Sequence, residues 1–220
     1  ARLDSHHWWY IGRRKLFSKL IREMGLDPGD PVLDIGTSSG TNLRMLRDMA
    51  FSDVTGLDFS EEAIRFCAQN GLGTVRRGDI TALPFGDQSF SLVLATDILE
   101  HVDDDGKALA EVARVLRPGS NALITVPAFP ALWGFQDEVS LHKRRYRMGP
   151  LLERIRAAGL QPEDRFPFNY LLFAPIWPAR QIRQMWRTDY RIESAVIPPL
   201  LELLTPAPSY LNLPRPPRRH

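Results

Sequence analysis

Three aspartates each follow a short apolar segment in the first part of the chain: Asp34, Asp58 and Asp79. Because the carboxyl ends of parallel strands meet at one edge of a sheet, acids at three strand ends would lie along a single edge. Carboxylates accept hydrogen bonds from hydroxyl and amino groups. The pattern therefore predicts a binding site for an elongated ligand that carries several hydrogen-bond donors.

The loop after Asp34 has the composition of a ligand-binding turn. Gly36 and Gly40 enclose small residues, among them Thr37 and Ser38, and apolar residues then recur near helical spacing. A strand, a glycine-marked loop and a helix N-terminus let backbone N–H groups approach a ligand closely. An acid just before the first glycine favours a ligand with a cationic end over a pyrophosphate.

Each acid suits one part of a sulfonium nucleoside. Asp58 lies about twenty residues after the glycine loop, where an acid can accept both hydroxyls of a ribose. Asp79 can accept from the exocyclic amine of an adenine, and the backbone N–H of Ile80 can meet a ring nitrogen. Asp34 suits the amino-acid end and the positive charge. Together they are complementary to S-adenosylmethionine.

An NAD-binding Rossmann unit is the remote alternative for this glycine loop. Asp58 alone would fit that interpretation. The loop from Gly36 to Gly40 is not Gly-x-Gly-x-x-Gly, however, and Asp34 would repel a pyrophosphate.

Strand and helix patterns alternate along the chain. This alternation predicts an α/β fold, a doubly wound and mostly parallel sheet with helices on both faces. The predicted strands are 31–35, 53–58, 74–77, 90–96 and 122–126, with a sixth at 160–166. A helix is predicted over 13–24 after an aromatic arm, and others begin after Gly40, at Ser60, after 103–105 and at Pro150.

At this point the chain resembles the class I S-adenosylmethionine-dependent methyltransferases, in the methyltransferase type 11 branch. The resemblance covers roughly residues 30–160. It is carried by six segments in the family's order, at 32–36, 56–60, 78–85, 87–90, 97–102 and 115–119. It implies the Rossmann-like fold of that class, S-adenosylmethionine as the methyl donor and S-adenosylhomocysteine as the product.

The resemblance also assigns parts of the cofactor to single residues: the methionine end to Asp34 and Gly36, the ribose to Asp58, the adenine to Asp79 and Phe59, and the surroundings of the sulfonium to Thr96. The chain departs from the family at Ser38, where a glycine is usual. A serine there is compatible with close approach if its φ is negative. The segment 209–214 is a poor match for the family's last strand.

Two histidines are placed to act on a methyl acceptor. His101 follows the fourth predicted strand, and His142 lies in an insertion after the fifth. Either could orient an oxygen or nitrogen nucleophile or take its proton, and either could instead be held by loop backbone. We expect a small-molecule acceptor that bears a sugar, phosphate or lipid. A cofactor-binding regulatory or scaffold protein without turnover is the alternative.

Nucleic-acid and membrane partners are weighed from charge and apolar runs. The basic runs 13–15 and 143–145 read as solvated faces, and the Asn/Asp-Pro-Pro-aromatic tetrad of base-amino methyltransferases is missing after the fourth strand, so no nucleic acid is expected. The apolar stretch 169–178 is too short and too proline-broken to span a bilayer. It suits a lid packed on the domain, a dimer contact, a lipid-bearing acceptor or peripheral contact with a membrane surface, which leaves a monomer or a homodimer open.

Composition bounds the remaining expectations. The chain has 220 residues, a net charge of +2 and a single cysteine, Cys67, which fits a reducing cytosol. Residues 103–105 read as a helix N-terminus, and because no other cluster has the spacing of metal ligands, no metal is expected. We predict an arm and helix over 1–30, a cofactor-binding core over 31–166 with an acceptor-side insertion at 127–149, and an irregular extension over 167–220.

Overall fold

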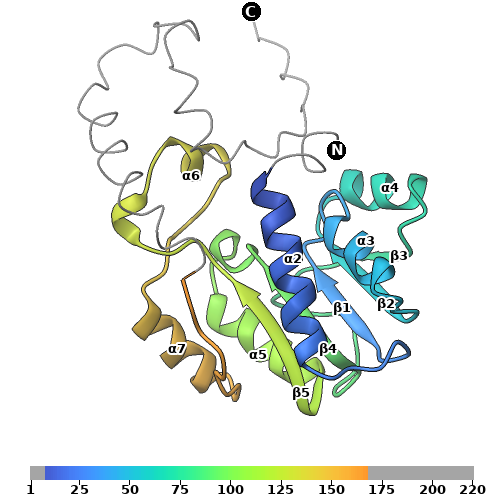
Figure 1. The fold of residues 1–220 in the computed structure, drawn as a ribbon. Helices are drawn as coiled ribbons and strands as arrows, with labels where there is room; N and C mark the ends of the chain where they lie inside the picture. Colours follow the sequence, from blue (N-terminus) through green and yellow to red (C-terminus); the bar gives the residue numbers. More distant parts are fainter. Residues whose placement is uncertain (1–7, 168–220) are drawn as a thin grey trace, which may run out of the picture. The chain divides into compact units, whose positions relative to one another are not determined.

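A computed structural model describes residues 8–167. The chain divides into two units, Ala1–Tyr170 and Leu171–His220, and the described residues lie in the first. Their five strands form one parallel sheet in the order β3-β2-β1-β4-β5. The strands are β1 (Val32–Ile35), β2 (Val54–Asp58), β3 (Thr74–Arg77), β4 (Phe90–Thr96) and β5 (Leu116–Thr125). The predicted doubly wound α/β fold is confirmed (Figure 1).

Six α-helices and two short 3-10 turns accompany the described sheet. The helices are α2 (Trp8–Glu23), α3 (Thr41–Asp48), α4 (Glu61–Gln69), α5 (Asp105–Val115), α6 (Phe135–Val139) and α7 (Met148–Ala157). The turns are η1 (Leu99–His101) and η2 (Pro130–Leu132). None of these helices is long and apolar enough to cross a membrane.

Alternating side chains of the central strands build two cores, one on each face of the sheet. Leu92 and Leu94 of β4 pack with residues of α2 and α3, whereas Val93 packs on the other face with residues of α5. β1 is fully buried along its length. This two-sided burial explains why the strands read as continuous apolar runs in the sequence.

The strand order reverses between β1 and β4, both of which pair with parallel neighbours. Asp34 of β1 lies in register with Gly56 of β2 on one side and Leu94 of β4 on the other. In open α/β sheets, ligands bind outside the carboxyl ends of the strands at such a reversal. The fold thus places the loop after β1 at the preferred binding position.

The N-terminal helix differs from its predicted bounds. We expected an aromatic arm before a helix at 13–24, but α2 already begins at Trp8. Trp8, Trp9 and Tyr10 therefore form part of the helix backbone, and the prediction of a separate arm is wrong for these residues.

Three further boundaries differ from the sequence-based expectations. β5 begins at Leu116, so residues 117–119 belong to an irregular strand start, with a register shift between Phe90 and Leu92 of β4. α7 begins two residues before Pro150, which still lies in the first helical turn, where its missing N–H breaks no helical hydrogen bond. Residues 160–166 form no strand. The predicted extension after residue 167 lies outside the described residues, as does the segment 209–214.

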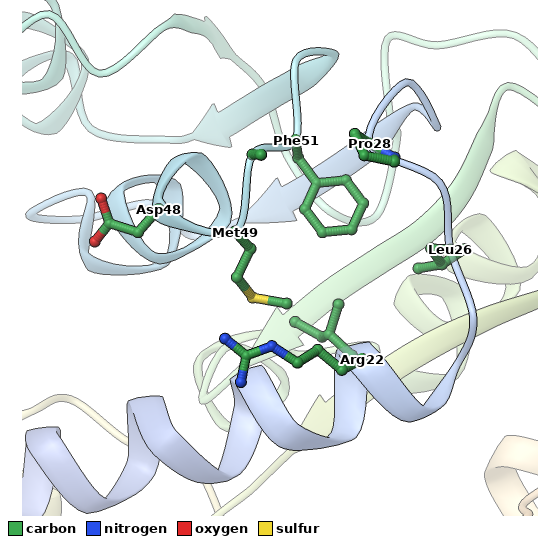
Figure 2. A pocket seen from close by; sticks show the side chains of 8 residues that line it. Arg22, Leu26, Pro28, Asp48, Met49 and Phe51 are labelled. Carbon is green, nitrogen blue, oxygen red and sulfur yellow. The ribbon is translucent and has the colours of Figure 1, made fainter.

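A pocket of about 270 Å³ opens near the amino-terminal ends of β1 and β2 (Figure 2). It lies between the end of α2 and the end of α3, and its lining includes Leu26, Met49 and Phe51. Because the strands run away from this pocket, it is not at the edge that carries the three aspartates.

Candidate active site

The loop between β1 and α3 is held in a conformation that glycine permits. Gly36 and Gly40 have φ of 77° and 70°. A Cβ on Gly40 would lie only 2.4 Å from Cδ1 of Leu72 and 3.2 Å from Sγ of Cys67. The loop therefore packs directly on the residues beneath it, Leu72 and the buried Cys67.

Ser38 differs from the sequence-based expectation. A negative φ was the condition under which a serine would permit close approach of a ligand, but Ser38 has a φ of 47°, in the left-handed region that favours glycine. Its backbone N–H donates to Oδ2 of Asp58 at 2.8 Å, which holds this conformation. The geometry gives a physical reason for the glycine that the family usually has at this position.

Asp34 is fully buried at the end of β1, and only one of its oxygens has a partner within the described structure. Nδ2 of Asn42 donates to Oδ1 at 2.8 Å, whereas Oδ2 accepts no hydrogen bond from the described residues. Burial raises the pKa of Asp34 to about 7. An unpaired buried carboxylate oxygen is costly without a donor or a positive charge beside it. It fits the cationic amino-acid end predicted for the ligand.

Asn42 is a site residue that the sequence analysis missed. The same Nδ2 that reaches Asp34 also donates to Oγ1 of Thr96 at 3.0 Å. Asn42 thus joins the carboxyl ends of β1 and β4 and positions two predicted cofactor residues. Its place in the first turn of α3, directly after the glycine loop, was the only available signal in the sequence.

Asp58 ties the loop to β2. Oδ1 accepts from the backbone N–H of Ser60 at 2.8 Å, and Oδ2 accepts from that of Ser38 at 2.8 Å, with Oγ1 of Thr37 at 3.5 Å. A carboxylate offers about four lone-pair sites, so acceptor capacity remains. The half-buried Asp58 is thus fixed in orientation and still able to accept about one further donor, such as a ribose hydroxyl.

The predicted adenine residues lie beside β2 and β3. The ring of Phe59 is 72% exposed, with the guanidinium of Arg77 5.9 Å from its centre. Asp79 is exposed, and its Oδ1 accepts from the backbone N–H of Thr81 at 2.8 Å. The side chain of Ile80 is buried in the core, so only its backbone is suited to a ligand. An exposed aromatic face next to an exposed carboxylate suits an adenine.

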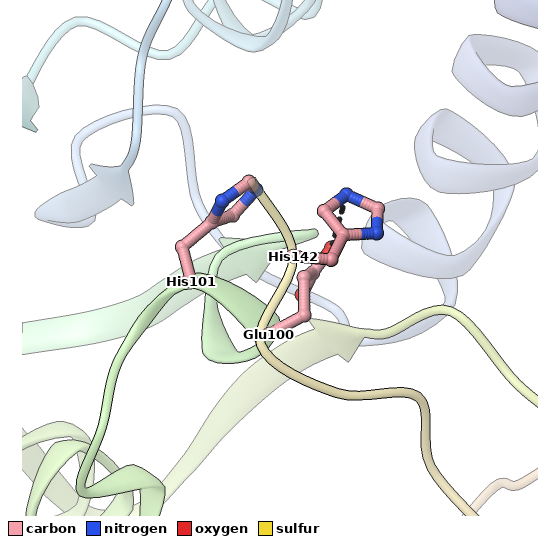
Figure 3. Close-up of side chains that lie close together, drawn as sticks. All are labelled: Glu100, His101 and His142. Atoms are coloured by element: carbon pink, nitrogen blue, oxygen red, sulfur yellow. Dashed lines mark ion pairs between the residues drawn. The ribbon is translucent and has the colours of Figure 1, made fainter. Parts of the chain in front are cut away.

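The fold brings the two predicted histidines together at the carboxyl end of β4. The rings of His101 and His142 lie 4.9 Å apart in an edge-to-face arrangement. Figure 3 shows both beside Glu100, although His142 comes from the distant segment after α6. Burial, followed by the neighbouring His142, lowers the pKa of His101. The imidazoles of His101 and His142 thus lie side by side at the carboxyl end of β4, where the sequence predicts that the acceptor enters.

Asp137 orients His142 from behind. Its Oδ1 lies 2.9 Å from Nδ1 of His142 and accepts from Nε of Arg145 at 2.7 Å. Burial opposes ionisation of Asp137, but the hydrogen bonds from His142 and Arg145 hold its pKa below the ordinary value. An ionised partner at Nδ1 leaves Nε2 of His142 directed toward Glu100, 4.0 Å from Oε1.

The N-terminal helix also reaches this edge. A guanidinium nitrogen of Arg13 in α2 donates to Oδ2 of Asp97, and Oγ1 of Thr125 donates to Oδ1 of Asp97 at 2.9 Å. Asp97 has a φ of 52°. These contacts join α2 to the ends of β4 and β5. They show how the helix, rather than a separate arm, borders the site.

The cations of the second basic run, 143–145, all form ion pairs with neighbouring acids. Lys143 pairs with Asp103 at 2.6 Å, Arg144 with Asp105 at 3.2 Å and Arg145 with Asp137 at 2.7 Å. Arg144 and Arg145 therefore hold the insertion after β5 to buried acids, whereas Lys143 and its partner are exposed. The expectation of a solvated face is wrong for Arg144 and Arg145 only.

The family model described as a methyltransferase domain matches residues 33–124. A ubiquinone/menaquinone biosynthesis C-methyltransferase UbiE of Bdellovibrio bacteriovorus is 33% identical over 150 residues, covering 63% of this chain and 61% of the relative. A Mycolicibacterium smegmatis protein, named a probable S-adenosylmethionine-dependent methyltransferase, is 27% identical to this chain. The match covers 74% of this chain and 63% of that relative. The chain thus spans less than two thirds of the length of these relatives.

Among solved structures, the chain resembles a methyltransferase in complex with the Haloferax volcanii Trm112 activator. The TM-score is 0.64 with 27% identity, covering 74% of this chain and 72% of the other. The strand order β3-β2-β1-β4-β5 and the glycine loop after β1 are those of a doubly wound, nucleotide-binding α/β fold. Over residues 33–124 the chain matches a methyltransferase domain, and these similarities support a class I methyltransferase.

Proposed function

We propose that this protein transfers a methyl group from S-adenosylmethionine to an oxygen or nitrogen atom of a small-molecule acceptor. The observation that carries the proposal is the buried, unpaired Oδ2 of Asp34 beside a loop of positive-φ glycines. A cationic ligand end would supply what this oxygen lacks. The printed name of the Mycolicibacterium smegmatis relative supports S-adenosylmethionine as the methyl donor.

In this proposal, residues at three strand ends each bind a different part of the cofactor. Asp34 would hold the methionine end, Asp58 the ribose hydroxyls and Asp79 with Phe59 the adenine. Thr96, fixed through Asn42, would border the reacting centre. When bound, the cofactor would supply an electrophilic methyl group on a sulfonium, whose sulfur would leave as the neutral thioether of S-adenosylhomocysteine when the acceptor atom bonds to the methyl carbon.

The acceptor would enter between the end of β4 and the insertion after β5. Displacement requires its nucleophilic atom about 3 Å from the methyl carbon, with water excluded. The imidazole of His142, held through Nδ1 by Asp137, would receive the proton that the nucleophile loses. His101 would orient the acceptor from the adjacent turn.

His142→Ala is expected to lower kcat/KM on a true acceptor by about 100-fold or more, the usual contribution of a positioned base. The Kd for S-adenosylmethionine should stay close to that of the wild type, because His142 borders the acceptor side. Steady-state kinetics with calorimetry measures both. An unchanged kcat/KM would remove His142 from the mechanism.

The activity itself is tested with methyl-labelled S-adenosylmethionine and a panel of hydroxyl, amino and carbon acceptors. A carbon acceptor belongs in the panel because the Bdellovibrio relative is named a C-methyltransferase. Label in an oxygen or nitrogen product supports the proposal. Label only on carbon overturns the assigned atom, and cofactor binding without any product would favour a regulatory or scaffold protein.

A further inference from the structure

Glu100 is a buried acid whose ion-pair partner in the described structure is Nε2 of His142, 4.0 Å from its Oε1. Its side chain is 1% exposed, and neither carboxylate oxygen makes a hydrogen bond with the described residues. Such a group is neutralised by a proton or by a cation. Its surroundings distinguish the two.

Two imidazoles face this carboxylate. One ligand atom each from Glu100, His101 and His142 can be chosen so that all three lie within 4.8 Å of one another. Figure 3 shows the two rings on the same side of Glu100. Ligand atoms around a tetrahedral zinc ion lie about 3.3 Å apart, given Zn–N bonds of about 2.0–2.1 Å. The ligand atoms thus need to approach one another by about 1.5 Å at most.

The support behind the group also matches a metal site. Histidines that bind metals almost always hold a carboxylate or carbonyl at the other ring nitrogen. Asp137 lies 2.9 Å from Nδ1 of His142, which leaves Nε2 on the side of Glu100, 4.0 Å from its Oε1. The backbone is fixed as well, because the N–H of Lys143 donates to the carbonyl of Glu100 at 2.7 Å. This bond joins the two segments that supply the ligands.

We propose that Glu100, His101 and His142 bind a divalent transition-metal ion at the acceptor side of the site. Two nitrogen donors and one carboxylate favour zinc, cobalt or a similar ion over magnesium or calcium, which prefer oxygen ligands. Three protein ligands leave a position open for a further oxygen atom. With the ion bound, Nε2 of His142 is a ligand and cannot take the acceptor's proton, so the role of base proposed for His142 applies to the protein without the ion. The use of the open position by the acceptor rests on the proposed function; the binding of the ion does not.

The sequence predicted no metal because His142 is distant along the chain from the Glu100-His101 pair. The insertion after β5 folds back, so that His142 lies at the end of β4. The ion pairs of residues 143–145 hold it there. Glu100 was not a candidate, since a single acid next to a histidine carries no metal-ligand spacing by itself.

Metal binding is tested on the full chain after dialysis against a chelator, without cofactor or acceptor. Titration with Co²⁺, followed by visible absorption, and with Zn²⁺, followed by calorimetry, should each give one ion per chain. Mg²⁺ should not compete at equal concentration. Because no methyl transfer is measured, failure here leaves the proposed methyltransferase activity standing.

Variants separate this site from adventitious binding. His142→Ala and, as a ligand variant of nearly equal size, Glu100→Gln should each lower Co²⁺ affinity at least 100-fold, and Asp137→Asn should lower it about 10- to 100-fold. The matched control is the double variant His6→Ala/His7→Ala, which removes the adjacent N-terminal histidines and should bind as the wild type does. Thermal melting confirms that each variant is folded. The proposal is overturned if no ion binds, or if binding survives Glu100→Gln but is lost in the control.

Discussion

Asp34→Asn is expected to stabilise the protein at pH 8 while it weakens cofactor binding. The wild-type carboxyl is fully buried with a pKa of about 7, against 3.8 as its ordinary value. A raised pKa means that the folded state holds the proton more tightly than the unfolded state. The stability from this group is therefore complete below pH 3.8 and is lost as the pH rises through 7.

The amide keeps the acceptor for Asn42 and has no charge to bury. We expect Asp34→Asn to raise the free energy of unfolding by about 3 kcal/mol at pH 8, the order given by the pKa shift, and to give little gain at pH 4. Urea denaturation across this pH range measures the difference. Asp48→Asn, an exposed acid of α3, is the control and should leave the profile unchanged.

The same variant should bind S-adenosylmethionine at least 10-fold more weakly, because a hydrogen bond to a charged group contributes about 1.5–3 kcal/mol. A stabilised fold with weaker binding is the combination expected of a residue kept for a ligand. Unchanged affinity would show that the cationic end of the cofactor lies elsewhere.

Asp105→Ala is expected to be the most destabilising of the substitutions considered. Oδ2 of this buried acid accepts from the hydroxyl of Tyr146 at 2.9 Å and from Arg154 at 2.5 Å, and it pairs with Arg144 at 3.2 Å. It thereby fastens the acceptor-side insertion and α7 to the start of α5. Removing one partner of a buried charge network costs about 3–5 kcal/mol. Because Arg154 is half-exposed, we expect the lower end, about 3 kcal/mol.

Asp103→Ala is the matched control, two residues away. Its side chain is 89% exposed and pairs with Lys143 of the same insertion. Exposed ion pairs contribute little, so the denaturation midpoint should hardly move. If both variants unfold at the wild-type midpoint, the buried network does not hold the insertion in place.

The strands and the cofactor loop could be predicted because local patterns determine them. Val32 to Ile35 form a buried run before a glycine, and Ser60 caps α4 by accepting from the N–H of Ala63. Patterns of this kind require only neighbours along the chain. They place the three aspartates at one edge without knowledge of any side-chain contact.

The acceptor side could not be predicted to the same depth because tertiary contacts determine it. Asn42 donates a hydrogen bond to Thr96 of β4, which is distant along the chain. Glu100 lies near His142 only because the insertion after β5 folds back onto the end of β4. The left-handed conformation of Ser38 likewise follows from its bond to Asp58 rather than from its residue type. Non-local contacts of this kind have no period or spacing in the sequence.

The central claim is that Asp58 at the end of β2 holds the ribose of S-adenosylmethionine. Calorimetric titration of the wild type and of Asp58→Ala with S-adenosylmethionine tests it directly, with NAD as a second ligand. One site per wild-type chain is expected, with binding weakened by about 2–3 kcal/mol in the variant and no binding of NAD. Equal affinity in both proteins, or preference for NAD, would contradict the assignment.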